Sequence, residues 1–220
     1  MSATYNPKAF DVADKNAAMG IILTPEGSTT ELRWKIETPY VADLIGQTIN
    51  ITSSTIILDY GCGIGRMAKE LIDRHQCCVI GVDISPKMLE LAHQYVQSDR
   101  FLGCSPLMLD TLTESGLRFD AAISIWVLQH CLKPDEDISR IQRSLRPNAG
   151  VFVLNNKWRA VPTVEKAWAN DGIDIKTSLA EHFMLIHEGR LPPDKTTNSL
   201  SNIHFWAVFE NENPSKTAAQ

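Results

Sequence analysis

At residues 57–66 the chain reads Ile57-Leu58-Asp59-Tyr60-Gly61-Cys62-Gly63-Ile64-Gly65-Arg66. A short apolar run ends in an acid, three alternate glycines follow, and a stretch of helical period begins at once. Glycine permits the backbone angles of a tight turn and lets the main chain approach a ligand closely. The helix that follows presents unpaired N–H groups at its start. The segment therefore predicts a strand, a ligand-binding turn and a helix in direct succession.

Short β-branched runs and longer helical stretches alternate from Ser54 onward, which predicts an α/β fold with a mostly parallel sheet. Helices are expected at residues 31–45, 67–75, 86–96 and 135–145. Ser85 is expected to cap the third of these helices, with Pro86 at its first position. Strands are expected at residues 55–59, 79–83, 107–109, 119–127 and 151–154, with a closing hairpin at 182–187 and 203–210.

The composition predicts a single globular domain without an overall positive charge. A length of 220 residues suits one core, and 21 Lys+Arg against 26 Asp+Glu give a net charge of −5, which disfavours nucleic acid or anionic membrane as partner. The N-terminus does not resemble a secretory signal, and no apolar run approaches the roughly 20 residues of a membrane span. The five cysteines include no CxxC pair, so we expect reduced thiols, a cytoplasmic location and no metal site.

Asp83 ends the second expected strand, at the same sheet edge as the glycine turn. Its carboxylate is suited to accept hydrogen bonds from the two hydroxyls of a ribose. The glycines follow the order GxGxG rather than the GxGxxG of dinucleotide sites, and Asp59 would repel a diphosphate. A carboxylate at that point suits a ligand with an ammonium group and a cationic sulfur, and S-adenosylmethionine has both. A site for another nucleotide stays open as the alternative.

These segments, together with Gly81-Val82-Asp83-Ile84-Ser85, resemble the class I family of S-adenosylmethionine-dependent methyltransferases. Similarity at residues 119–120, 127–130 and 144–150 extends the resemblance over about residues 54–156. It implies a three-layer α-β-α sandwich with a Rossmann-like, mostly parallel seven-stranded sheet of order 3-2-1-4-5-7-6, in which strand 7 is antiparallel. We expect one methyltransferase domain over residues 1–220, with an N-terminal helical lid at 1–45, a catalytic core at 46–210 and a flexible tail at 211–220.

The resemblance also implies a set of cofactor contacts at the ends of the first four strands. The implied contacts are Asp59, Gly61, Cys62, Gly63, Asp83, Ile84, Asp110, Thr111 and Ile125. Asp59 would hold the amino group of the cofactor, Asp83 the ribose, and Asp110 with Thr111 the adenine amine. A simple turn-capping role for Asp110 is equally open.

His130 follows the fourth expected strand and is the candidate general base, although bracing of its own loop is the favoured interpretation. Outside candidates for the base are Glu165, His182 and His204. The acceptor pocket is expected to form from residues 1–45, 157–181 and 189–202. Its expected contacts are Trp34, Trp126, Lys157 and Trp158. With Arg159 nearby, this set suits a small, partly aromatic or carboxylated acceptor.

The expected reaction is methyl transfer to an oxygen or nitrogen of a small-molecule acceptor, carried out by a monomer or homodimer. Two alternatives stay open. The run 126–130 and the Ser-Leu-Arg-Pro-Asn segment also resemble enzymes that methylate protein N-termini, which would make a peptide amine the acceptor. A catalytically silent module that binds S-adenosylmethionine and regulates a partner is the other alternative.

Overall fold

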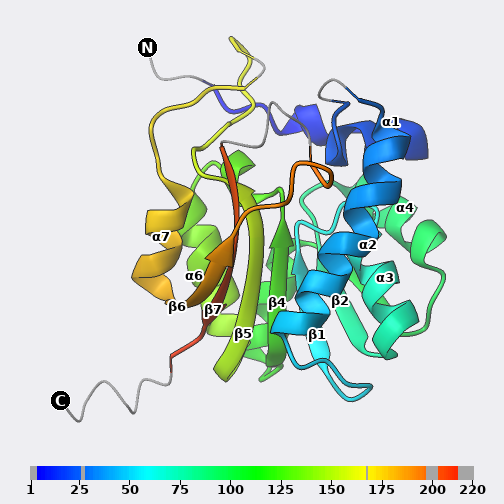
Figure 1. Cartoon of the computed structure of the whole chain (residues 1–220), viewed down its shortest axis with the longest axis vertical. Coiled ribbons are helices and arrows are strands. Elements are labelled where there is room, and N and C mark those ends of the chain that lie inside the picture. The colour runs from blue at the N-terminus through cyan, green and yellow to red at the C-terminus, as the bar shows by residue number, and fades with distance from the viewer. Residues whose placement is uncertain (1–3, 26–27, 167, 197–202, 213–220) are drawn as a thin grey trace.

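The computed structural model describes residues 4–25, 28–166, 168–196 and 203–212, which form a seven-stranded sheet between two layers of helices (Figure 1). The strands are β1 Ile56–Tyr60, β2 Cys78–Val82, β3 Phe101–Cys104, β4 Phe119–Ile125, β5 Leu145–Asn156, β6 Met184–Gly189 and β7 His204–Glu210. The α-helices are α1 Lys15–Ile22, α2 Thr30–Thr48, α3 Arg66–His75, α4 Pro86–Val96, α5 Pro106–Glu114, α6 Pro134–Ser144 and α7 Ile175–His182. Two short 3-10 helices, η1 Pro7–Phe10 and η2 Leu128–His130, complete the described elements.

The order of the sheet is β3-β2-β1-β4-β5-β7-β6, which confirms the expected fold class. Strands β1 to β5 pair in parallel, and β7 is antiparallel to both β5 and β6. The expected closing hairpin is therefore correct, with β7 inserted between β5 and β6. Within the described residues, no helix combines the length and the apolar character that a bilayer crossing requires.

Alternation of side chains along the strands builds two cores. Ile57 and Phe152 point to the face covered by α2, α3 and α4, where they pack in one cluster of buried residues. Leu58 and Val153 point to the other face and pack with residues of α5, α6 and α7. Because successive strand residues face opposite sides, a central parallel strand needs apolar residues at nearly every position. This requirement explains the continuous apolar runs from which the strands were predicted.

The third strand was predicted at the wrong place. The structure puts β3 at Phe101–Cys104, and residues 107–109 belong to α5 instead. The Oγ of Ser105 caps α5 by accepting the N–H of Met108, and Pro106 occupies its first turn. The chain uses the same Ser-Pro start at α4, where Ser85 accepts the N–H of Met88 as expected. The repeated Ser-Pro pair indicates a helix start more strongly than the short apolar run at residues 107–109 indicates a strand.

The ends of the chain also differ from expectation. Helix α1 forms within the first 30 residues, for which little periodicity was expected, and α7 begins within the stretch 157–181 and ends at His182. Asn211, placed in the expected flexible tail, is buried and donates its N–H to the carbonyl of Ala149. The rest of that tail, residues 213–220, lies outside the described residues.

Truncation of Phe152 tests the core between the sheet and α2. Phe152 is fully buried and stacks on Trp206 with ring centroids 6.2 Å apart. We expect Phe152→Ala to lower the free energy of unfolding by about 3–5 kcal/mol, because the lost contacts leave a cavity. Urea denaturation followed by circular dichroism measures this. The matched control is Ile186→Ala on β6, which is 54% exposed and should change stability by less than about 0.5 kcal/mol.

Candidate functional site

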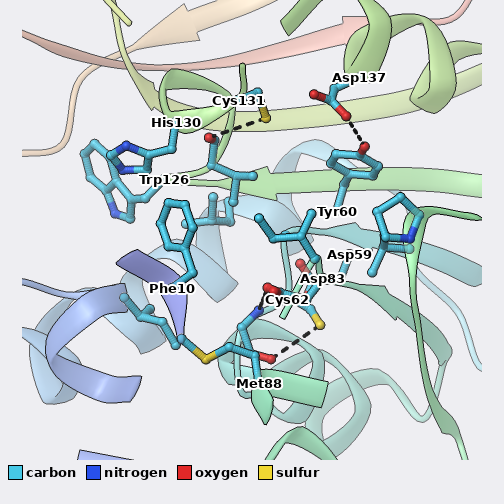
Figure 2. A pocket seen from close by; sticks show the side chains of 18 of the residues that line it. Phe10, Asp59, Tyr60, Cys62, Asp83, Met88, Trp126, His130, Cys131 and Asp137 are labelled. Carbon is cyan, nitrogen blue, oxygen red and sulfur yellow. Dashed lines mark hydrogen bonds between the residues drawn. The ribbon is translucent and has the colours of Figure 1, made fainter. Parts of the chain in front are cut away.

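A cavity of about 300 Å³ lies at the carboxyl ends of β1, β2 and β4, and Figure 2 shows the side chains around it. Its lining includes Asp59 to Gly63 at the end of β1, Val82 to Ile84 at the end of β2, and Ile125 to Val127 at the end of β4. The N-terminal segment adds Tyr5, Phe10, Ile21 and Ile22. In an open α/β sheet, ligands bind in this crevice beyond the strand ends.

The turn after β1 bends through three glycines with positive φ, at 79° for Gly61, 53° for Gly63 and 77° for Gly65. A Cβ at Gly61 would lie 2.3 Å from Val127, and one at Gly63 would lie 2.7 Å from Ile22. The glycines are therefore required both by the backbone conformation and by close neighbours from the turn after β4 and from α1. They leave the main chain itself as the floor of the cavity.

Asp83 is fixed by the turn that it faces. One carboxylate oxygen accepts the N–H of Gly63 at 2.9 Å, and the other accepts the N–H of Ser85 at 2.9 Å. Burial raises the pKa of Asp83, while backbone N–H groups of Ser85, Gly63 and Ile84 act in the opposite direction. Each oxygen keeps a second lone pair for a ligand hydroxyl. Ile84, 51% exposed, stands next to it at the cavity.

Asp59 is the unsatisfied group of the site. Of the described residues that line the cavity, it alone has a buried side-chain oxygen, Oδ2, without a hydrogen-bond partner. Burial raises the pKa of Asp59 to about 7, the Arg66 guanidinium lowers it, and the Asp83 carboxylate raises it. A buried acceptor of this kind costs free energy until a donor reaches it. A ligand ammonium group is such a donor.

The hydroxyl of Tyr60 is engaged by hydrogen-bond partners within the protein. Its hydroxyl donates to Asp137 at 2.5 Å and accepts from Arg140 at 3.1 Å. Burial, followed by the nearby Asp137 carboxylate, raises the pKa of Tyr60 above its usual range. Cys131, on the same wall, also keeps its proton because burial raises the pKa of its thiol. Neither group is available for proton transfer at neutral pH.

His130 lies at the other end of the cavity, beside Phe10 and Trp126 (Figure 2). Its Nδ1–H donates to the carbonyl of Ala160 at 2.7 Å, and its Nε2 lies 3.1 Å from the Gln129 amide nitrogen. Burial lowers the pKa of His130 to about 4, although the bond to Ala160 raises it. Rings of Trp168 and Phe10 pack against the imidazole at centroid distances of 4.6 and 5.9 Å. This geometry favours bracing of the loop over proton abstraction.

Several predicted site residues do not reach the cavity. Asp110 and Thr111 lie in α5, because the third strand ends before them, and Asp110 pairs with Arg140 and Arg143 instead of facing the cavity. The end of β3 reaches the lining through Pro106, two residues beyond Cys104. The prediction that Asp110 and Thr111 end a strand at the adenine position is therefore wrong.

Three of the four predicted acceptor contacts also lie outside the cavity lining. Trp34 packs edge-on against Tyr95 at 6.0 Å, and Lys157 pairs with Asp174 at 3.4 Å while covering Trp158. Only Trp126 lines the cavity. No described residue of the stretches 157–181 and 189–202 belongs to the lining. Lys157 and Arg159, the cations expected to suit a carboxylated acceptor, therefore do not line the cavity.

The outside base candidates likewise have structural roles away from the lining. Glu165 accepts the N–H of Thr4, His182 lies 3.3 Å from Gln142, and His204 accepts the N–H of Leu191. Tyr5 and Phe10 were not predicted as site residues, because they come to the cavity from a stretch with little periodicity. Arg66 was not assigned a role either. The burial of this cation, 2% exposed after a glycine turn, was not readable from the sequence.

A family model described as a methyltransferase domain matches residues 57–148. The "Ubiquinone biosynthesis O-methyltransferase" of Bartonella quintana is 30% identical over 107 residues, covering 47% of this chain and 43% of that protein. The enzyme of the same name from Coxiella burnetii is 25% identical over 107 residues, covering 47% of this chain and 45% of that protein. The matched region thus spans less than half the length of these curated relatives.

Solved structures share the fold at low identity. A geranyl diphosphate methyltransferase in complex with S-adenosylmethionine superposes with a TM-score of 0.64 at 12% identity, covering 95% of this chain and 96% of that chain. The [4+2]-cyclase SpnF superposes with a TM-score of 0.60 at 16% identity, covering 96% and 88%. In its domain match over residues 57–148 and in the strand order of its sheet, the chain is similar to the class I, Rossmann-like family of S-adenosylmethionine-dependent methyltransferases.

Proposed function

We propose that the chain binds S-adenosylmethionine in this cavity and transfers its methyl group to an oxygen or nitrogen of a small-molecule acceptor. The observation that carries the proposal is the buried, unpartnered Oδ2 of Asp59 beside a turn of bare backbone. Asp59 suits the ammonium group of the cofactor, the glycine turn suits close approach of its methionine and ribose part, and Asp83 suits the ribose hydroxyls. Ile84 offers an apolar face for the adenine.

When bound, the cofactor supplies a methyl group that its sulfonium has already activated for displacement. The chain then has to orient the acceptor and keep water away. The N-terminal residues Tyr5, Phe10, Ile21 and Ile22 line the cavity, which supports a lid function for the N-terminal segment 1–45. His130 lines the cavity as a neutral imidazole. It is a weak base, because its pKa is about 4 and both of its nitrogens are engaged.

The residues at the acceptor end of the cavity favour an uncharged, flat small molecule over a carboxylate as the acceptor. Phe10, Trp126 and His130 line that end as aromatic rings, while Lys157 and Arg159 pair with Asp174 and Asp171 outside it. Lys133, which does line the cavity, is paired with Glu136. Aromatic walls favour a flat apolar acceptor. Curated relatives named as O-methyltransferases favour oxygen over nitrogen as the methylated atom. The five free cysteines support a reducing compartment, such as the cytoplasm.

The proposal is tested with S-adenosylmethionine labelled in its methyl group and a fractionated extract of small molecules. We expect label in a small-molecule product with the wild-type chain and at least a tenfold lower rate with Asp59→Asn. Transfer to short peptides, with no small-molecule product, would support the peptide-amine alternative instead. Tight cofactor binding without any labelled product would support the non-catalytic module.

Cofactor affinity should depend on pH through Asp59. In the free protein this carboxyl is half protonated near pH 7, and a cationic amino group requires the carboxylate, so the affinity rises with pH and levels off above 7. We expect the Kd for S-adenosylhomocysteine to weaken by about tenfold per pH unit below 7. Calorimetry between pH 5.5 and 7.5 measures this. Asp59→Asn should flatten the profile; a wild-type Kd independent of pH would contradict the role of Asp59.

Gly61→Ala tests the backbone turn. The added methyl group meets Val127 and the residue keeps a positive φ, so we expect cofactor binding to be lost and the free energy of unfolding to fall by at least about 1–2 kcal/mol. The matched control is Gly150→Ala on β5, where the new Cβ lies no closer than 3.4 Å to Ile49. Calorimetry and thermal unfolding compare the two variants. Full cofactor affinity in Gly61→Ala would show that the turn is not the binding floor.

A further inference from the structure

A buried network of charges joins α2 to both ends of the cavity. Glu37, 1% exposed, lies at its centre. Its Oε2 accepts from Arg33 at 2.8 Å, and its Oε1 accepts from Arg66 at 3.4 Å. Arg33 and Arg66 are 6% and 2% exposed, and Arg33 also donates to the carbonyl of Thr24. Fully desolvated charges of this kind persist only when each one is paired.

The same carboxylate holds the Trp126 side chain. The indole Nε1–H of Trp126 donates to Oε1 of Glu37 at 2.8 Å, across 89 residues of sequence. Trp126 adopts a φ of 62° directly after β4, a conformation that L-residues avoid, and its N–H donates to the carbonyl of Leu154. The bonds at both ends of the residue keep the ring in place as a wall of the cavity.

Arg66 connects the network to the cofactor end. It lines the cavity, and its Nη1 also donates to Thr38 at 3.1 Å. The charged groups that act on Asp59 are Arg66 from α3 and Asp83 after β2, and Arg66 is the cation that favours the charged form of Asp59. Those that face Glu37 are Arg33 from α2 and Arg66 from α3. The Arg66 guanidinium is thus hydrogen-bonded to Glu37, and its charge also lowers the pKa of Asp59.

We propose that Glu37 is a positioning residue that sets both walls of the cavity, by holding Arg66 back from Asp59 and by fixing the Trp126 indole. This inference rests on the proposed function, since it assigns how α2 tunes that same site. With Arg66 engaged by Glu37, the Asp59 carboxylate stays free for a ligand ammonium group. With the indole fixed, the aromatic wall presents one orientation to the acceptor. Helix α2 is therefore expected to be part of the site although it contributes no residue of the cavity lining.

The test compares S-adenosylhomocysteine binding by Glu37→Gln and by Glu31→Gln, an exposed residue of the same helix. Calorimetry from pH 5 to 7.5 gives the pH at which the affinity is half its plateau. We expect Glu31→Gln to keep the wild-type midpoint. Glu37→Gln should lower that midpoint by about one pH unit, because Arg66 then pairs with Asp59, and should weaken plateau binding about tenfold. If Glu37→Gln only lowered the thermal stability of the protein, the pH midpoint of binding would stay at the wild-type value.

The indole contact is tested by Trp126→Phe, which keeps an aromatic ring and both Arg–Glu pairs but removes the N–H donor. We expect the wild-type pH midpoint for S-adenosylhomocysteine and at least a tenfold slower labelling of the extract fraction that the wild-type chain labels. If Glu37→Gln fails to fold, the double variant Arg33→Gln/Glu37→Gln removes one charge of each sign. It should show the same lowered midpoint.

The outcomes separate the inference from the proposed function. A wild-type chain that does not bind S-adenosylhomocysteine at any pH would overturn both. Wild-type binding with an unchanged midpoint in the folded Glu37→Gln or double variant would overturn the role of Glu37 alone. Wild-type labelling rates in Trp126→Phe would overturn the indole contact as a positioning device.

Discussion

The backbone turn between β1 and α3 is the constraint on which the site depends. The chain leaves a buried strand and enters a buried helix within residues 61–65, and it does so through three glycines at positive φ. The absence of side chains there lets Val127 and Ile22 pack directly against the turn. The N–H of Gly63 also fixes Asp83 from the neighbouring strand. One local conformation thereby brings the ends of β1, β2 and β4 into a single cavity.

Charge is distributed unevenly along this cavity. Asp59, Asp83 and Arg66 lie by the glycine turn, whereas Phe10, Trp126 and a neutral His130 line the opposite end. The other charged residues of the lining are engaged in ion pairs, Lys133 with Glu136 and Asp137 with Arg140. Such a separation suits a cationic cofactor held by carboxylates beside an acceptor that is held by shape and aromatic contact. Of the described residues that line the cavity, only Asp59 has a buried side-chain oxygen without a hydrogen-bond partner, and it lies at the charged end.

The fold by itself does not specify the reaction. A methyltransferase complex and a [4+2]-cyclase superpose on this chain with similar TM-scores. The reaction therefore depends on the residues of the site and not on the fold alone. Here the N-terminal segment and α2 distinguish the cavity, because they supply its aromatic cover and the Glu37 carboxylate that links Arg66 to Trp126.

Local patterns of residues were enough to predict most of the central sheet and the charged end of the cavity. Glycines at alternate positions, an acid at each of two strand ends and continuous apolar runs are local signals, and each one follows from backbone geometry or burial. They were sufficient to predict β1, β2, β4, the strand order through the family resemblance, and the placement of Asp59 and Asp83 at the cavity. The position of β3 was also encoded, in the pair Ser105-Pro106, but a short apolar run obscured it.

The aromatic end of the cavity and the contacts of α2 could be placed only from the packing of the whole chain. Tryptophan and lysine side chains are compatible with either packing or ligand binding. Trp34, Lys157 and Trp158 lie outside the cavity lining and contact other residues of the protein instead. Tyr5 and Phe10 reach the site from a segment without periodicity, held in part by an antiparallel bridge from Tyr5 to Thr163. The contact between Glu37 and Trp126 spans 89 residues. Such contacts depend on how distant elements pack together, and no local pattern of residues specifies that packing.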